Sequence, residues 1–387
     1  MFKKIPKNVI FLGFVSLFND ISSEMIYPIV PIFLTSVLHA PVSIVGLIEG
    51  IAEGTASFMR FLSGYISDRF YKRKIFVTLG YSLSAISKPI IGLALSWPLV
   101  LFGRFLDRLG KGVRTSARDS ILLQSADKNN KGYIFGFHRA MDSMGAVFGP
   151  LIALILLYFL NNNMRPIFFI AFVPSVIGVF LLILLVKERG KPVGEKFKFN
   201  FKWKSLNPNF KFFLLISLIF AVGNSSDAFL ILRAQNLGLG VLLTTLTYVL
   251  YNTSQTIFAT PAGALADRIG AKKVYSYGLL VFAAVYFCFG AIHSSFWIWF
   301  LFPIYGLYIA ATDGVSKAYI SEFIVEKESG TYFGIYQSGI AICTFLASFA
   351  GGLIWTAYGS QYTFYYGAAA AFIAFIVLSF GKIARKL

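Results

Sequence analysis

Charged side chains crowd one segment of a chain that is otherwise apolar. The segment RFLDRLGKGVRTSARDS, residues 104–120, directly follows the apolar run LSWPLVLFG. Successive residues of a helix are rotated by about 100°. One face, which spans roughly a third of the circumference, therefore carries Arg104, Asp107, Arg108, Lys111, Arg114 and Arg118. A charge at the membrane centre costs about 2.5–3.5 kcal/mol, so this face must meet water or counter-charges. Arg114, Arg118 and Asp119, nearer the cytoplasmic end, could pair with headgroups, whereas Arg104 and Arg108 lie deeper.

Possible counter-charges occur on three other apolar segments. They are Asp20, Glu24 and Tyr27 with Asn19 and Ser23 beside them, then Glu49, Glu53 and Arg60, and then His138, Arg139 and Asp142. The sole role of such a network could be to neutralise the arginines. In membranes, however, these networks usually mark ion or substrate paths. We therefore predict proton coupling by Asp20, Glu24, Glu53 and Asp142, with His138 as a relay.

The second half of the chain offers mainly amides, hydroxyls and aromatic rings. Its candidate polar wall consists of Asn224, Asp227, Asn252, Gln255, Asp313, Lys317, Tyr336 and Gln337. This asymmetry predicts proton handling in the first half and substrate contact shared by both halves. From the first half, the predicted substrate contacts are Asn19, Tyr27, Arg104 and Arg108.

The elements that position these residues are twelve predicted membrane-spanning helices. Hydrophobic residues make up 57% of the 387 and charged residues only 13%, against roughly 25% charged in soluble domains. The predicted spans are 8–36, 43–67, 75–95, 98–123, 132–160, 166–186, 210–234, 240–266, 273–292, 296–321, 331–357 and 362–383. Unpaired backbone groups are not tolerated in lipid, so we expect an all-α bundle. The third and ninth spans read as plain apolar helices.

The basic residues indicate the topology. The net charge of +18 would suggest nucleic-acid binding in a soluble protein, but here the lysines and arginines fall in alternate loops. The positive-inside rule then places both termini in the cytoplasm of a cell-membrane protein. The first segment lacks a small-residue cleavage site and continues as a span, so no removable signal peptide is predicted. Cys288 and Cys343 lie inside predicted helices, where packing is their expected role.

An internal repeat divides the chain into two similar halves. GYISDR at 64–69 recurs as GALADR at 263–268, SSE at 22–24 as SSD at 225–227, and KGYIFGF at 131–137 as SGTYFGI at 329–335. Internal repeats of this kind are typical of transporters. We therefore predict an N-terminal six-helix bundle, 1–186, a basic cytoplasmic linker, 187–209, and a C-terminal six-helix bundle, 210–387.

These motifs resemble those of the major facilitator superfamily over nearly the whole chain. GYISDRFYKRK is similar to the family's signature loop between the second and third helices, with Gly64, Asp68, Arg69 and Lys72 in place and Tyr71 where a glycine is usual. GALADRIGAKK, with Gly263, Asp267 and Arg268, is the second copy. The resemblance implies that both loops act as conformational latches. It also implies a monomer that needs no cofactor, carries no resident metal and moves a small solute by alternating access.

Two further resemblances concern the type of transport. Arg104 occupies the place of the fourth-helix arginine found in proton-coupled members of the family. GAVFGP, with Gly145, Gly149 and Pro150, resembles the fifth-helix pattern of the exporter branch, although ordinary helix packing explains such spacing equally well. The resemblance favours proton-coupled efflux, as in drug:proton antiporters. The alternative is proton-coupled transport of an organic anion or a metal–carboxylate chelate, which the excess of cationic side chains favours.

Other functional classes are disfavoured by the motifs. The sequence contains no phosphate-binding loop, zinc-protease helix motif or nucleophile elbow, so an enzyme is not predicted. Two signature loops in a repeat suit alternating access better than a pore. A free divalent metal as substrate stays an alternative, because Asp20, Glu24, His138 and Asp142 offer hard ligands and one imidazole.

Overall fold

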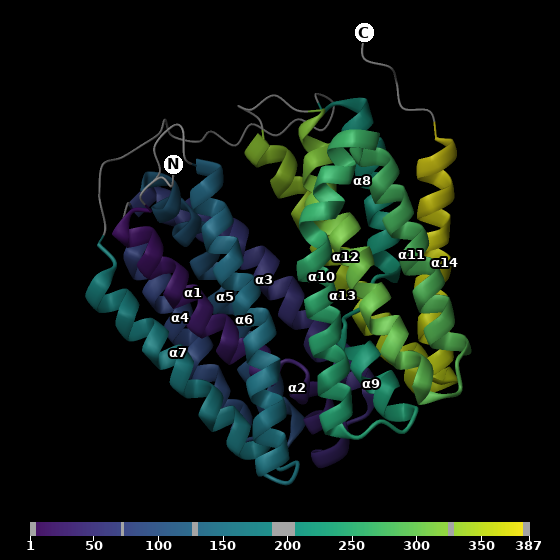
Figure 1. Ribbon diagram of the computed structural model, residues 1–387, viewed down its shortest axis with the longest axis horizontal. Helices are drawn as coiled ribbons and strands as arrows, with labels where there is room; N and C mark the ends of the chain where they lie inside the picture. Colours follow the sequence, from purple (N-terminus) through teal and green to yellow (C-terminus); the bar gives the residue numbers. More distant parts are fainter. Residues whose placement is uncertain (1–4, 71–72, 126–130, 188–205, 324–328, 382–387) are drawn as a thin grey trace. The chain divides into compact units, whose positions relative to one another are not determined.

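A computed structural model describes residues 5–70, 73–125, 131–187, 206–323 and 329–381 of the chain. These residues form helices without a β-strand (Figure 1). The helices are α1 (Lys7–Ile26), α2 (Ile29–Ile32), α3 (Val42–Phe70), α4 (Arg73–Gly92), α5 (Trp97–Gln124), α6 (Lys131–Phe159), α7 (Arg165–Leu185), α8 (Pro208–Gly223), α9 (Ala228–Asn236), α10 (Val241–Ile269), α11 (Ala271–Ala291), α12 (Ile298–Ser321), α13 (Ser329–Tyr358) and α14 (Ser360–Phe380). The prediction of an all-α membrane protein with twelve spans is confirmed.

The first and seventh spans are each broken before their end. In the first span α1 ends at Ile26, and Pro28, which has no backbone N–H, separates it from α2 and a π-helical turn at Phe33–Val37. In the seventh span α8 ends at Gly223 and α9 begins at Ala228, so residues 224–227 lie outside regular helix. Polar residues at such a break can use backbone groups that a continuous helix would occupy.

Ten of the spans among the described residues are long and apolar enough to cross a membrane by composition alone. The other two are α5, which carries the charged face, and α10, which is rich in threonine and amide side chains. The lower apolar content of α5 fits its packing against α4 within unit 1, whereas α10 exposes Ile257, Phe258 and Leu265.

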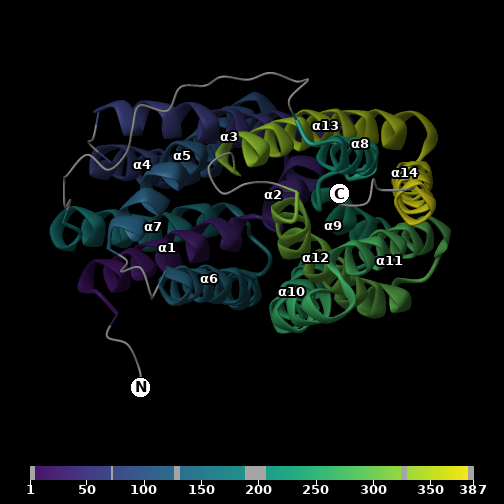
Figure 2. The same cartoon turned by 90° about the horizontal axis from the view of Figure 1, so that it is seen from above.

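The described residues group into two compact units. Unit 1 comprises those within 1–40, 51–194 and 241–246, and unit 2 those within 41–50, 195–240 and 247–387. In unit 1, α1 packs between α6 and α7, and α4 packs against α5 and α7 (Figure 2). In unit 2, α11 packs against α12 and α14, and α8 against α13 and α14. Two helices, α3 and α10, each contribute residues to both units.

One helix-end hydrogen bond occurs in both units. Lys74 Nζ, at the start of α4, donates to the carbonyl oxygen of Ile183 at 2.9 Å, near the end of α7. Lys272 Nζ, at the start of α11, donates to the carbonyl oxygen of Gly381 at 3.4 Å, just after α14. A cationic side chain satisfies the last carbonyls of a helix and complements its dipole. The sequence repeat thus corresponds to a repeated helix-end contact within each unit.

Candidate functional site

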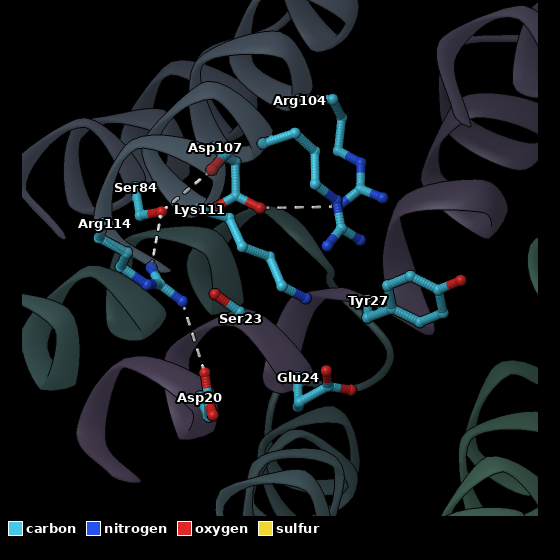
Figure 3. A pocket seen from close by; sticks show the side chains of 10 residues that line it. Asp20, Ser23, Glu24, Tyr27, Ser84, Arg104, Asp107, Lys111 and Arg114 are labelled. Atoms are coloured by element: carbon cyan, nitrogen blue, oxygen red, sulfur yellow. Dashed lines mark hydrogen bonds and ion pairs between the residues drawn. The ribbon is translucent and has the colours of Figure 1, made fainter. Parts of the chain in front are cut away.

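A polar cavity lies within unit 1. It is lined by Asp20, Ser23, Glu24, Tyr27, Ser84, Arg104, Asp107, Arg108, Lys111 and Arg114. The two acids of α1 face the four basic side chains of α5 across this space (Figure 3). The cavity therefore brings together Asp20, Glu24, Tyr27, Arg104 and Arg108 from the predicted site.

Asp20 is paired at one end of the cavity. Its Oδ1 lies 3.6 Å from Nη2 of Arg114. The Arg114 guanidinium also donates from Nη1 to Ser84 Oγ at 3.2 Å and lies 4.4 Å from the ring centroid of Tyr81. Arg114 is therefore buried by protein contacts, which contradicts its interpretation as a headgroup-binding residue.

Asp107 is shared by two cations, one of which the sequence interpretation missed. Lys88 Nζ lies 2.8 Å from Asp107 Oδ1 and 3.2 Å from Ser23 Oγ, whereas Arg104 Nη1 lies 3.9 Å from Asp107 Oδ2. Lys88 comes from α4, the third span, and its side chain is 0% exposed. The prediction that this span is a plain apolar helix is therefore wrong. A single lysine within SAISKPII was the available signal, because a buried ammonium in a membrane helix requires a partner.

Tyr27 and the two deep arginines form one wall of the cavity. The Cζ atoms of Arg104 and Arg108 lie 5.6 and 6.0 Å from the Tyr27 ring centroid, within the range of cation–π attraction. Arg108 Nη2 lies 3.5 Å from Glu53 Oε1 on α3. Glu53 thus pairs with Arg108 but is not itself a cavity-lining residue.

Lys111 lies between the two α1 acids and the deep arginines. Its side chain points toward the space between Glu24 and Tyr27 (Figure 3). Within the described part of the chain, Lys111 makes no ion pair, unlike Arg104, Arg108 and Arg114. The Lys111 charge is therefore balanced at longer range, by the carboxylates of Glu53, Asp20 and Glu24.

A second polar cluster lies outside the cavity lining, toward the C-terminal end of α5. Asp142 Oδ2 lies 3.5 Å from Nδ1 of His138 and 4.0 Å from Nη1 of Arg118. Ser16 Oγ donates to Asp142 Oδ1 at 2.6 Å and accepts from Arg118 Nη1 at 3.2 Å. His138 and Asp142 therefore lie together as predicted, but in a cluster separate from the lining of the cavity.

Two glycines of the exporter-like motif bring α6 against the acidic face of α1. A Cβ added at Gly145 would lie 2.7 Å from Asp20 Cβ, and one at Gly149 would lie 2.7 Å from the carbonyl oxygen of Ile21 and 2.8 Å from Glu24 Cβ. Such contacts are too close for any residue larger than glycine. The motif therefore fixes the distance between α6 and the two α1 acids, and Pro150 follows inside the same helix.

Asn19 and Glu49 are placed elsewhere. Asn19 is buried and accepts a hydrogen bond from Ser175 Oγ on α7 at 3.4 Å, and it is not among the residues that line the cavity. Glu49 belongs to unit 2, where its Oε2 accepts from Ser226 Oγ at 3.4 Å. Glu49 and Glu53 share a helical face, yet they belong to different units.

In unit 2, Asp227 is held by tyrosines at the break between α8 and α9. The hydroxyl groups of Tyr251 and Tyr305 donate to its carboxylate at 3.0 and 2.7 Å. Asn224 Nδ2 donates to Tyr308 Oη at 3.2 Å. Asn224 and Asp227 are therefore part of a tyrosine-rich network inside unit 2.

Two other predicted residues of unit 2, Asn252 and Tyr336, have described partners within that unit. Asn252 Nδ2 donates to the carbonyl oxygen of Tyr248 in its own helix at 3.1 Å. Tyr336 is buried and stacks on Phe213 with ring centroids 5.9 Å apart. Gln255 and Gln337 are half-buried on α10 and α13. The structure brings these four residues into no common hydrogen-bond network among the described contacts.

The signature-loop residues are described only in the second copy. Gly263, Asp267 and Arg268 lie on α10, with the Asp267 and Arg268 side chains exposed. Gly64, Asp68 and Arg69 fall in a stretch of α3 whose side chains are not described, and Lys72 lies outside the described residues, as does most of the linker 187–209.

The described residues offer no ligand set for the alternative in which a divalent metal ion is the substrate. Among the described side chains, no group of three or more His, Cys, Asp and Glu residues is arranged to hold a metal ion. Asp20 pairs with Arg114, while Asp142 pairs with His138 and Arg118. The four candidate ligands are thus divided between two clusters.

Comparisons with known proteins agree with the fold and its repeat. The Major Facilitator Superfamily profile matches residues 12–251 and 212–386. The chain is 38% identical over 387 residues to MJ1317, an uncharacterized MFS-type transporter of Methanocaldococcus jannaschii, and the match covers 98% of this chain and 96% of the relative. It is 25% identical over 343 residues to the uncharacterized protein Mb2288 of Mycobacterium bovis, covering 86% and 82% of the two chains.

Solved structures share the architecture at low sequence identity. The crystal structure of a mutant of the nucleoside transporter NupG superposes with a TM-score of 0.80 at 12% identity, covering 96% of this chain and 99% of that one. A POT family transporter in complex with 5-aminolevulinic acid gives 0.81 at 12% identity, covering 97% and 96%. At such identities the likeness concerns the fold alone.

The arrangement of membrane helices around a buried charged cavity defines a multi-pass membrane transporter. The chain belongs to the Major Facilitator Superfamily. Its general activity is therefore secondary transport of a small molecule across a membrane, and the family it belongs to consists of transporters rather than enzymes.

Proposed function

We propose that this protein couples the movement of a small anionic solute to protons. The observation that carries the proposal is the cavity of unit 1, where acids of α1 face bases of α5 across one space. Protonation of an acid and entry of an anion then change the same local charge balance in opposite directions.

The charges around the cavity favour an anion. Within the described part of the chain, the lining residues and the ion-pair partners given above for them comprise five cationic side chains, Lys88, Arg104, Arg108, Lys111 and Arg114, and four carboxylates, Asp20, Glu24, Glu53 and Asp107. One positive charge is in excess when every acid is ionised, and two when one acid is protonated. Uncompensated charge in a low-dielectric site is costly. An anion therefore binds best after an acid has been protonated, so anion and proton travel together.

The proton sites in this proposal are the two cavity-lining acids, Asp20 and Glu24. Asp20 Oδ1 lies 3.6 Å from Arg114 Nη2. This ion pair should weaken when the Asp20 carboxyl group is protonated, because the charge attraction is then lost. The His138–Asp142 pair on α6 serves as a relay toward the cytoplasmic end. In this proposal Glu53 holds the Arg108 side chain in place through their ion pair.

The proposal is tested in proteoliposomes that carry an imposed pH gradient. Asp20→Asn, Glu24→Gln and Asp142→Asn are compared with Asp313→Asn, whose carboxylate is half exposed and pairs with Lys317 in unit 2. Uphill solute movement should be lost in at least one of the first three variants and kept in the control. If all three retain uphill transport driven by the pH gradient, the proposal is wrong.

Proton-coupled efflux by antiport is the second candidate. It is favoured by the exporter-like GAVFGP motif, whose Gly145 and Gly149 pack directly on the α1 segment that carries Asp20 and Glu24. In antiport, protons and solute compete, so a neutral or cationic solute would leave as protons enter. The direction of solute movement under the same pH gradient separates the two candidates.

The cycle we propose is alternating access by movement of the two predicted halves, 1–186 and 210–387. The halves lie in the cell membrane with both termini in the cytoplasm, as the alternating basic loops indicate. A monomer is sufficient for this cycle, because each chain carries both halves. Asn224 and Asp227 are the residues of the second half that we propose for substrate contact.

A further inference from the structure

The start of α11 and the end of α14 meet at one end of unit 2. The two helices pack side by side within this unit (Figures 1 and 2). Lys272 Nζ, in the first turn of α11, donates at 3.4 Å to the carbonyl oxygen of Gly381, which directly follows α14. One turn further along, the hydroxyl oxygens of Ser276 and Ser379 share a hydrogen bond of 2.9 Å. The first turn of α11 and the last turn of α14 therefore lie at the same level.

This level corresponds to a boundary of the membrane. α11 and α14 have 21 residues each and are apolar enough to span a bilayer. At 1.5 Å per residue each helix is about 30 Å long, which matches the thickness of the hydrocarbon core. Their shared end therefore lies at the level of the lipid headgroups, on the side that the basic loops predict to be cytoplasmic.

Two lysines at this boundary carry charges that no described carboxylate pairs with. Lys272 is half-buried and Lys273 is exposed, and among the described residues neither forms an ion pair. An ammonium group has three N–H donors, and the Gly381 carbonyl oxygen takes one of those of Lys272. The stretch 267–273, DRIGAKK, has one acidic and three basic residues, so this end of unit 2 is positively charged.

An exposed apolar stripe continues from the lysines toward the middle of the membrane. Its side chains are Tyr277, Leu280 and Phe287 on α11 and Phe372, Ile376 and Phe380 on α14. The Phe287 ring lies 5.5 Å from the ring of Tyr365 on α14, so the stripe borders the seam between the two helices. Tyrosine favours the membrane–water interface, and apolar side chains favour the hydrocarbon region. The seam thus offers ammonium groups at headgroup level and an apolar surface below them.

The equivalent face of unit 1 lacks the polar end. α4 starts with the same helix-end contact, which is made by Lys74. One and five residues after this lysine, α4 exposes Ile75 and Leu79. The same positions of α11 are occupied by Lys273 and Tyr277, which are also exposed. The polar end is therefore specific to unit 2 and is not a requirement of the repeated architecture.

We propose that the seam between α11 and α14 binds an anionic phospholipid, whose phosphate lies at Lys272 and Lys273 and whose acyl chain follows the apolar stripe. A net negative headgroup complements the two ammonium groups, whereas a zwitterionic headgroup brings no net charge. Tyr277 lies between the two parts of the site, at the interface. The inference is independent of the proposed anion transport and of the unit 1 cavity.

The test is native mass spectrometry of the detergent-solubilised full chain. The probes are dioleoyl-phosphatidylglycerol, which is anionic, dioleoyl-phosphatidylcholine, which is zwitterionic, and glycerol 3-phosphate, a soluble phosphate ester without an acyl chain. Binding of the first phosphatidylglycerol at least about fivefold more tightly than phosphatidylcholine supports the proposal. Equal binding of the two lipids overturns it, as does binding of glycerol 3-phosphate as tightly as phosphatidylglycerol.

The variants give unit 2 the residues of unit 1. Lys273→Ile/Tyr277→Leu should bind phosphatidylglycerol about fivefold more weakly than the wild type and phosphatidylcholine equally well, because one basic group near the lipid phosphate is lost. Adding Lys272→Met should weaken phosphatidylglycerol binding by a similar factor again. Both side chains replaced in the first variant are exposed, so its thermal unfolding midpoint without added lipid should stay that of the wild type.

The matched control removes a lysine elsewhere in unit 2. Lys317→Met replaces an exposed lysine of α12 that pairs with Asp313, and it should bind phosphatidylglycerol as the wild type does. Unchanged phosphatidylglycerol binding in Lys273→Ile/Tyr277→Leu overturns the proposal. An equal loss in Lys317→Met also overturns it, because the effect would then reflect the total charge of the protein and not this seam.

Discussion

Gly149→Ala should disturb the contact between α6 and the α1 acids. The added methyl group would lie 2.7 Å from the carbonyl oxygen of Ile21, 2.8 Å from Glu24 Cβ and 3.0 Å from the amide nitrogen of Met25. Two of these three atoms are backbone atoms, so a side-chain rotation cannot relieve the clash. The helices must separate by some tenths of an ångström at the level of Glu24.

The expected cost follows from two opposing effects. Overpacking a tight helix contact typically destabilises by about 1–3 kcal/mol, while alanine gains up to about 1 kcal/mol over glycine in a helix interior. At Gly149 the clash should dominate. At Gly136, on the same helix, an added Cβ would meet nothing within 4 Å, so Gly136→Ala should be neutral or slightly stabilising.

The assay compares both variants in detergent and in vesicles. Gly149→Ala should lower the thermal unfolding midpoint and reduce pH-driven transport, whereas Gly136→Ala should leave both at or above the wild-type level. If the two alanine variants behave alike, the close α1–α6 contact does not govern the position of Glu24, and the packing argument is wrong.

Three other predictions concern separate parts of the chain. Arg233→Met should lower stability by about 1–3 kcal/mol, measured by thermal unfolding, because its guanidinium donates to the carbonyl oxygens of Phe289 and Ile292 at 2.9 and 2.7 Å at the end of α11; an unchanged midpoint would contradict this. Asp68→Asn should shift cysteine accessibility toward the cytoplasm-open state, as expected for a signature-loop latch, and unchanged accessibility and transport would refute the latch. His138→Gln should slow pH-driven transport without abolishing solute binding, and unchanged turnover would remove His138 from the relay.

The twelve spans and their repeat could be predicted because each depends on local composition. Span length and apolar content are set by the membrane thickness, and the repeated Asp-Arg motifs mark matching helix ends. The breaks in the first and seventh spans were not predicted. Pro28 was a visible signal for the first break, but the polar run at 224–227 looks equally compatible with a continuous helix.

The charged face of α5 could be predicted from helical spacing, but its partners could not. A helical face shows which side chains lie together, not which neighbouring helix covers them. For this reason Asn19 was assigned to the substrate site although it bonds to Ser175 on α7. Lys88 was missed because one lysine barely lowers the apolar character of a span, yet it is the closest partner of Asp107.

The sequence also could not predict that His138 and Asp142 lie outside the cavity lining, because this depends on which helices pack together. Asp20 and Asp142 lie on different helices, and their distance depends on how α1 and α6 pack. Gly145 and Gly149 allow the close contact between these two helices. The sequence alone did not decide whether the two glycines belong to an exporter motif or serve ordinary helix packing. The structure shows that these glycines are packing residues located beside the acids.

The most direct test of the central claim is the proton balance of anion binding. Succinate is added to the detergent-solubilised protein in weakly buffered solution at near-neutral pH, and proton uptake is followed with an indicator dye. If anion and proton bind together in the unit 1 cavity, the wild type should take up as much as about one proton per bound succinate, and Asp20→Asn/Glu24→Gln should bind succinate without proton uptake. Release of protons on binding, or binding with no proton exchange in the wild type, would contradict the account.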